Sequence, residues 1–156
     1  MFNGIIYNTG KVISVEKTKK SIFIGVLSNN IFKKKDLGSS ISCNGVCLTL
    51  VKINKKKIYF YLSNETLNRS NFRSVKINQI INLEKSLSYG KIISGHYTQG
   101  HVDTVAKVIN VSIIDKTWLF KFNKPGFIYY GYLINLSNCI NMTLRKMTRN
   151  YFSIRK

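Results

Sequence analysis

Proline is almost absent from this sequence of 156 residues, which contains only one. A Pro-rich linker or stalk is therefore excluded. The chain is long enough for one ordinary domain or two small ones. Its hydrophobic fraction of 44% supplies enough apolar side chains for a core. These features indicate a folded protein without rigid spacers.

Acidic residues are also scarce: 6 Asp and Glu stand against 25 Lys and Arg, which gives a formal net charge of +19. Such an excess is compatible with a basic β-barrel that binds RNA. However, only 5 of the 25 basic residues are arginine, the better reader of phosphates and bases. The lysines are scattered, and an abundance of Lys, Asn and Ile is typical of A/T-rich codons. We therefore expect no nucleic-acid partner.

Cysteine is limited to three residues, an odd number. Cys43 and Cys47 lie about 13 Å apart in an extended strand at ~3.3 Å per residue, whereas a disulfide needs Cα atoms within about 7 Å. A bridge would therefore need a sharp fold at Gly45. The sequence has no secretory pattern at Met1 and no apolar run long enough to span a bilayer. We expect a reducing, cytoplasmic location and no membrane partner.

Short β-branched and aromatic runs, separated by polar turns, occupy the first half of the chain. They predict strands at 5–16, 21–27, 41–43, 46–53, 58–62 and 79–83. A short helix is expected to begin at Ser63 or Asn64 and to run to about Phe72. This spacing is typical of a small antiparallel barrel or sandwich. Strand alternation predicts four core residues: Phe23, Val46, Leu48 and Phe60.

The dipeptide Asn44-Gly45 is the strongest signal for a two-residue β-hairpin. It places Cys47 and Thr49 on one face of the strand that follows. Residues 138–144 resemble 44–50 at an offset of 94, and residues 100–109 resemble 4–13 at an offset of 96. Two matches at nearly one offset indicate a tandem repeat, with units at 1–88 and 89–156. On this offset the second unit stops where the first reaches Leu62, so we expect it to be incomplete.

Four blocks of the sequence resemble riboflavin synthase, the trimeric enzyme built from two tandem lumazine-binding barrels. They are Met1-Phe2-Asn3-Gly4-Ile5, Asn44-Gly45-Val46-Cys47-Leu48-Thr49, Glu65-Thr66-Leu67 and Gly95-His96-Tyr97-Thr98-Gln99-Gly100-His101-Val102-Asp103. The resemblance implies an all-β fold of two tandem six-stranded Greek-key barrels, the second incomplete. It implies dismutation of two 6,7-dimethyl-8-ribityllumazine molecules to riboflavin and 5-amino-6-(ribitylamino)uracil. The resemblance implies no cofactor. It implies a homo-oligomer, because the family's site lies between neighbouring subunits.

The resemblance also assigns site residues. The candidate catalytic residues are Cys47 and Ser40, which match polar residues suspected of assisting addition to the ring, and His101. The candidate substrate-binding residues of the first unit are Gly4, Ile5, Ile6, Cys47, Leu48, Thr49, Tyr61, Leu62, Ser63, Asn64, Glu65 and Thr66. Those of the second unit are Gly100, His101, Val102, Tyr132, Asn141, Met142 and Thr143. Glu65 and Thr66 would offer oxygen atoms to the ribityl hydroxyls.

The second unit departs from the family pattern. Asn138 replaces the expected acid, Cys139 the turn glycine and Asn141 the serine. These changes favour an alternative function: a non-catalytic lumazine- or flavin-binding protein, or a degraded remnant of the enzyme. Cys47 could also be a small core residue and Glu65 only an acid favoured in a first helical turn. The two histidines lack enough further ligands at suitable spacing for zinc, so we expect no metal.

Overall fold

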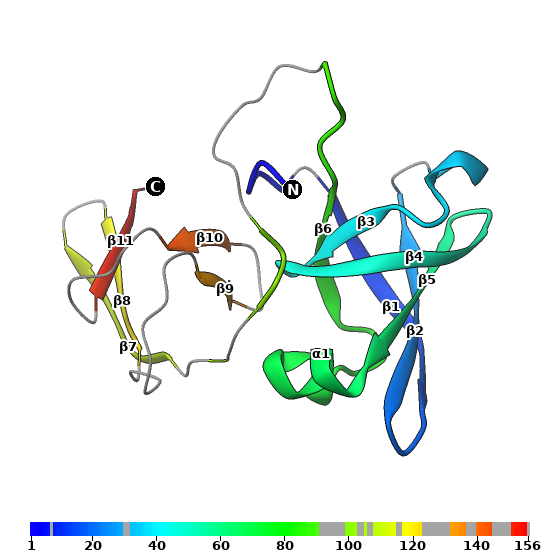
Figure 1. Cartoon of the computed structure of the whole chain (residues 1–156). Helices are drawn as coiled ribbons and strands as arrows, with labels where there is room; N and C mark the ends of the chain where they lie inside the picture. The colour runs from blue at the N-terminus through cyan, green and yellow to red at the C-terminus, as the bar shows by residue number, and fades with distance from the viewer. Residues whose placement is uncertain are drawn as a thin grey trace.

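The computed structural model describes residues 1–6, 8–29, 32–90, 99–102, 105, 108–114, 117–122, 132–136, 140–144 and 151–155. The first six strands close into an antiparallel barrel in the order β1-β2-β5-β4-β3-β6, with β6 paired back to β1 (Figure 1). Their bounds are β1 Asn8–Lys17, β2 Ser21–Ser28, β3 Ser40–Cys43, β4 Val46–Asn54, β5 Lys57–Ser63 and β6 Ile80–Lys85. The expected all-β, six-stranded Greek-key barrel is thus confirmed for the first unit.

Apolar side chains that alternate along each strand fill the barrel interior. Three of the four expected core residues, Val46, Leu48 and Phe60, belong to this cluster. The expectation for Phe23 is wrong: its neighbours Ile22 and Ile24 point inward, so Phe23 points outward. There its ring stacks on Tyr59 of the next strand, with ring centroids 5.9 Å apart. A run of consecutive apolar residues in β2 hid this register from the sequence pattern.

The β3–β4 hairpin turns at Asn44-Gly45, as the sequence predicts. Both residues have positive φ, 48° and 86°, the combination that a type I′ turn requires. The turn pairs Ser42 with Cys47 and Cys43 with Val46. It is the sharp fold that a Cys43–Cys47 bridge would need, yet both thiols are free. Cys43 belongs to the buried core whereas Cys47 faces outward, so the two side chains lie on opposite faces of the hairpin.

Helical structure is limited, in the part of the chain that the structure describes, to α1 Asn64–Arg69 and the short 3₁₀ segments η1 Lys34–Asp36 and η2 Asn71–Ser74. The expected helix start is correct, and the Ser63 hydroxyl accepts a hydrogen bond from the Thr66 N–H at 3.2 Å. The helix ends before Phe72 because Ser70 is extended, with φ −130° and ψ 167°. The Ser70 hydroxyl instead caps η2 by accepting from the Phe72 N–H.

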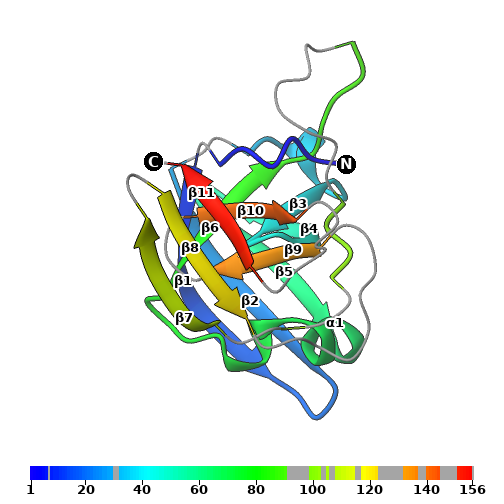
Figure 2. The same ribbon diagram turned by 90° about the vertical axis from the view of Figure 1, so that its left-hand side faces the viewer.

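The described strands of the second half form two small sheets (Figures 1 and 2). One has the order β11-β8-β7, built from Tyr151–Arg155, Thr117–Phe122 and Val108–Ile114. The other is the hairpin of β9 Tyr132–Leu136 and β10 Ile140–Leu144. This hairpin falls where the offset of 94 from β3 and β4 would place one. The repeat and the domain boundary at residue 88 stay predictions.

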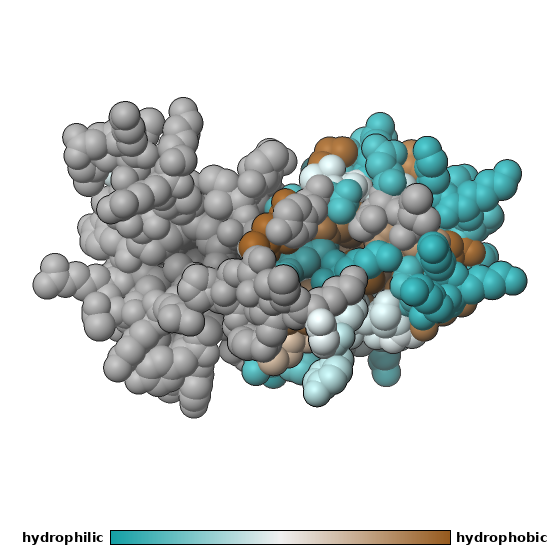
Figure 3. All heavy atoms as spheres, turned by 90° about the horizontal axis from the view of Figure 1, so that it is seen from above, coloured by the Kyte–Doolittle hydropathy of each residue, from teal (hydrophilic) through white to brown (hydrophobic). Residues whose placement is uncertain are grey.

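The described surface of the barrel is mixed in character. Hydrophilic side chains, drawn in teal, project from several places around it, with apolar residues between them (Figure 3). Among the described residues, no helix combines the length and apolarity needed to cross a membrane.

Candidate ligand-binding site

A cavity of about 340 Å³ lies where the start of β4, helix α1 and the segment 99–102 meet. Small-molecule sites commonly have volumes of roughly 300–1,000 Å³, so this space is large enough for one small ligand. Its walls carry a thiol, hydroxyls, a carboxylate, a guanidinium and an imidazole beside apolar groups. The lining residues are Val46, Cys47, Glu65, Thr66, Arg69, Ser70, Gly100, His101 and Val102.

The β4 wall follows from the alternation of that strand. Leu48 and Leu50 point into the core, so Cys47 and Thr49 lie on the outer face of the barrel. Cys47 is half-buried at the cavity, whereas Thr49 is exposed. Cys43, in the core, has a different environment: burial, and secondarily the nearby Cys47, raises the pKa of its thiol well above the ordinary value. Of these two thiols, Cys47 is therefore the one that a ligand can reach.

The segment 99–102 packs directly on β4. The Cys47 N–H donates to the Gly100 carbonyl oxygen at 2.8 Å. A Cβ at Gly100 would lie 2.5 Å from the Cys47 Cβ and 2.8 Å from the Cys47 nitrogen, so only glycine fits. Val102 packs against the barrel core, while His101 is exposed at the cavity. This contact brings His101 to the same cavity as Cys47, although the two are far apart in sequence.

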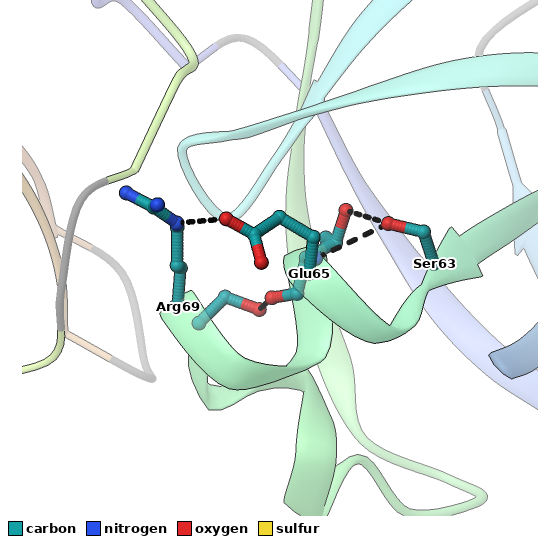
Figure 4. Close-up of polar contacts among 5 residues, drawn as sticks. Ser63, Glu65 and Arg69 are labelled. Atoms are coloured by element: carbon teal, nitrogen blue, oxygen red, sulfur yellow. Dashed lines mark hydrogen bonds and ion pairs between the residues drawn. The ribbon is translucent and has the colours of Figure 1, made fainter. Parts of the chain in front are cut away.

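Helix α1 supplies the third wall. The Arg69 Nε donates to Glu65 Oε1 at 2.5 Å, one turn along the helix, and both side chains are largely exposed (Figure 4). The Ser63 and Thr66 hydroxyls lie 3.1 Å apart, and the Ser70 hydroxyl donates to the Thr66 carbonyl at 2.6 Å. These bonds fix the first turn, so Glu65 and Thr66 are presented to the cavity from a rigid segment.

Six of the predicted site residues line the cavity: Cys47, Glu65, Thr66, Gly100, His101 and Val102. The others lie elsewhere. Ser40 pairs with Thr49 across β3 and β4, outside the lining. Leu48 and Leu62 are core residues that are 3% and 0% exposed, so only their backbone could face a ligand. Tyr61 is exposed on the outer face of β5, and Ser63 and Asn64 lie where that strand meets α1.

The four remaining predicted residues of the second unit, Tyr132, Asn141, Met142 and Thr143, lie on β9 and β10, outside the cavity lining. Tyr132 pairs with Leu144, and Thr143, Met142 and Asn141 pair with Leu133, Ile134 and Asn135. The departures at Asn138 and Cys139, like His96 and Asp103, fall outside the described residues. Within the described part of the chain, no group of three or more His, Cys, Asp or Glu side chains is placed to hold a metal ion.

The predicted residues Gly4, Ile5 and Ile6 belong to a segment that lies on the barrel rather than in a strand. The N–H groups of Asn3 and Gly4 donate to Glu84 Oε1, at 2.6 and 3.1 Å. Burial raises the pKa of the Glu84 carboxyl. The backbone N–H groups of Asn3, Gly4 and Ile5 and the Met1 ammonium partly oppose that rise.

Sequence reasoning predicted Val46 only as a core residue and missed Arg69 and Ser70 in the cavity. It also missed Glu84 under the N-terminal segment. Arg69 could have been predicted, because a residue four after Glu65 lies on the same face of a helix. Ser70 also lies within the helix that the sequence predicts to run to about Phe72. Glu84 had no local signal, because its partners Asn3 and Gly4 are 81 and 80 residues away in sequence.

The fold and the cavity define a closed six-stranded antiparallel barrel with a candidate small-molecule site beside it. Residues 3–86 match the lumazine binding domain. The riboflavin synthase of Buchnera aphidicola subsp. Baizongia pistaciae is 32% identical over 99% of this chain and 75% of its own length. The riboflavin synthase of Escherichia coli is likewise 32% identical, with the same coverage of both chains. The chain belongs to the riboflavin synthase family.

Solved structures support the same fold. LumP complexed with 6,7-dimethyl-8-(1'-D-ribityl)lumazine superposes with a TM-score of 0.73 at 21% identity, covering 99% of this chain and 85% of LumP. LumP complexed with flavin mononucleotide gives a TM-score of 0.72 at 22% identity, with 100% and 86% covered. At this identity the likeness is evidence for the fold.

Proposed function

We propose that this chain acts in the cytoplasm as a riboflavin synthase, dismutating two molecules of 6,7-dimethyl-8-ribityllumazine. One lumazine donates a four-carbon unit to the other, giving riboflavin and 5-amino-6-(ribitylamino)uracil. The observation that carries the proposal is the cavity itself. In a chain of the riboflavin synthase family, it brings Cys47, Glu65, Thr66 and His101 around one space of about 340 Å³.

The proposed roles follow from where each side chain lies. Glu65 and Thr66 receive the hydroxyls of the ribityl chain, because both present oxygen atoms from the first turn of α1. Cys47 lies against the ring and assists addition to it, and His101 faces the ring from the opposite segment. The reaction needs a proton removed from an acidic ring methyl and two rings held together. Much of the acceleration is therefore assigned to proximity of the two ligands.

The second ligand needs a second site. We assign units 1–88 and 89–156 as two lumazine-binding repeats, and we propose that a homo-oligomer, a trimer as in the family, brings a first unit of one subunit against a second unit of its neighbour. In this arrangement Ser40, Thr49, Tyr132, Asn141, Met142 and Thr143 complete the two sites.

The test is to incubate the purified chain with 6,7-dimethyl-8-ribityllumazine and to follow riboflavin by its fluorescence and by chromatography. Riboflavin and 5-amino-6-(ribitylamino)uracil should form in equal amounts without added cofactor. Cys47→Ser is expected to slow turnover more than it weakens ligand binding. Light scattering on the same sample measures the oligomeric state. Ligand binding without any product would refute the catalytic proposal.

The second candidate is a protein that binds lumazine or flavin without turning it over. Two observations favour it: the replacements at Asn138, Cys139 and Asn141, and the fold shared with LumP, solved with lumazine, riboflavin and flavin mononucleotide. Titration with each of these three ligands separates the candidates. A chain that binds them at one site per subunit and forms no riboflavin is a binding protein, and a chain that binds none is neither.

A further inference from the structure

We propose that Glu84 is a positioning residue, whose carboxyl group fastens the N-terminal segment (residues 1–6) to the outer face of the barrel and so sets one wall of the ligand site. This inference rests on the proposed ligand binding. It adds a residue of β6 that is not among the candidate site residues.

Glu84 lies in a row of outward-facing residues that leads to the cavity. It pairs with Ser42 of β3, which pairs in turn with Cys47 of β4. Leu83 and Cys43, the neighbours in sequence, point into the core. An outward row on a barrel is normally wet, yet Ser42 is 2% and Glu84 8% exposed. This part of the outer face is therefore covered.

The segment bound to Glu84 is the N-terminal one. The N–H groups of Asn3 and Gly4 both donate to Oε1, so one side-chain oxygen satisfies two backbone donors of this segment. Phe2 is 2% exposed, and the Leu87 N–H donates to the Met1 carbonyl at 3.0 Å. Gly4 has a φ of 76°, a conformation that glycine adopts without strain, so the chain can turn directly after its bond to Glu84.

Glu84 itself is placed to hold a segment and not to touch a ligand. Its second oxygen, Oε2, is buried and has no hydrogen-bond partner among the described residues, and the same holds for the Asn3 side-chain oxygen. A ligand in the cavity cannot reach an atom that solvent does not reach. Glu84 thus acts through the backbone of Gly4 and Ile5, candidate site residues that lie outside the lining of the cavity at Cys47 and that would extend the site along this row.

Three variants of the full-length chain test the proposal: Glu84→Ala, Glu84→Gln and Glu84→Asp. Gln keeps an acceptor at the position of Oε1, Asp is one methylene too short to reach it, and Ala has none. Glu16→Gln, an exposed residue of β1, is the matched control. The readouts are amide hydrogen exchange at Asn3 and Gly4, affinity for 6,7-dimethyl-8-ribityllumazine, and exchange at Leu83 as a measure of barrel integrity.

Glu84→Ala and Glu84→Asp should accelerate exchange at Asn3 and Gly4, and weaken lumazine binding, by about tenfold, since each lost hydrogen bond to a charged group contributes about that factor. Glu84→Gln and Glu16→Gln should stay within about threefold of the parent chain in both readouts. Rescue by Gln but not by Asp is the signature of positioning. If Glu84→Ala loses exchange protection at Leu83, its barrel is damaged. The comparison of Glu84→Asp with Glu84→Gln then decides the proposal.

Two results would overturn the proposal: unchanged exchange at Asn3 and Gly4 in both short variants, or a freed segment with unchanged affinity. Failure of the proposed function is distinguishable, because a parent chain that binds no lumazine still reports, through exchange, whether Glu84 holds residues 1–6.

Discussion

The contact between Gly100 and Cys47 makes a sharp prediction, because a single methyl group tests it. In Gly100→Ala the added Cβ would lie 2.5 Å from the Cys47 Cβ, 2.8 Å from its nitrogen and 3.0 Å from its Cα. Carbon atoms in contact prefer about 3.5–4.0 Å. The segment 99–102 must therefore move away from β4 by about 1 Å.

That movement determines how much ligand affinity the variant should lose. The hydrogen bond from the Cys47 N–H to the Gly100 carbonyl is 2.8 Å long, and a shift of about 1 Å stretches it beyond bonding range. Its net loss costs about 0.5–1.5 kcal/mol, which corresponds to an affinity loss of about three- to tenfold if the segment forms a wall of the site. The barrel should keep its stability to within about 1 kcal/mol, because Gly100 belongs to none of its strands.

Two assays check this. Titration with 6,7-dimethyl-8-ribityllumazine measures the affinity, and amide exchange at Cys47 reports the lost hydrogen bond without any ligand. Gly90→Asn is the matched control, since nothing lies within 4 Å of a Cβ there and Asn tolerates its φ of +77°. Adding Cys47→Gly to Gly100→Ala should not restore the parent values, because the backbone nitrogen still lies at 2.8 Å. Parent affinity and parent exchange in Gly100→Ala would refute the reasoning.

Three further predictions concern the barrel. Phe60→Ala removes a core ring with 0% exposure and should cost about 3–5 kcal/mol in urea unfolding, whereas its neighbour Tyr61→Ala, 53% exposed, should cost far less. Ser63→Ala removes the cap on the Thr66 N–H and should cost about 1 kcal/mol, which Ser63→Asp should restore. The pKa of Glu84 is raised above its ordinary value of 4.5, so its stabilising contribution is complete below that pH and is lost as the pH rises through the folded-state pKa. The free energy of unfolding of the parent chain, relative to Glu84→Gln, should therefore fall as the pH rises from 4.5, and a rise would contradict the buried position of this carboxyl.

Local patterns in the sequence were enough to predict most of the barrel. The turn at Asn44-Gly45 needs two residues that tolerate positive φ, and few dipeptides supply them. Strand alternation then places Cys47 and Thr49 together, opposite Leu48 and Leu50. Where apolar residues run consecutively, as around Phe23, the sequence does not show which of them face the core. The prediction that Phe23 is a core residue was therefore wrong.

The candidate site was predictable only in part, for a related reason. Resemblance marked Cys47, Glu65, Thr66 and Gly100 to Val102 as residues of one site, but not how they would meet. The helix pattern contained Arg69 and Ser70, yet nothing local showed that this face of α1 would border a cavity. The resemblance assigned Leu48 and Leu62 to the substrate site, but their burial excludes side-chain contact with a ligand.

The sequence by itself determined the strand positions, the β3–β4 turn, the start of α1 and the family of the chain, because each depends on neighbours within a few residues or on motif order. Only the tertiary structure decided that the outer face at Cys47 borders a cavity, that Gly100 must be glycine for lack of space, and that Glu84 holds Asn3 and Gly4. These last contacts join residues 80 or 81 positions apart. Closure of the barrel creates them, and no local pattern encodes such a distance.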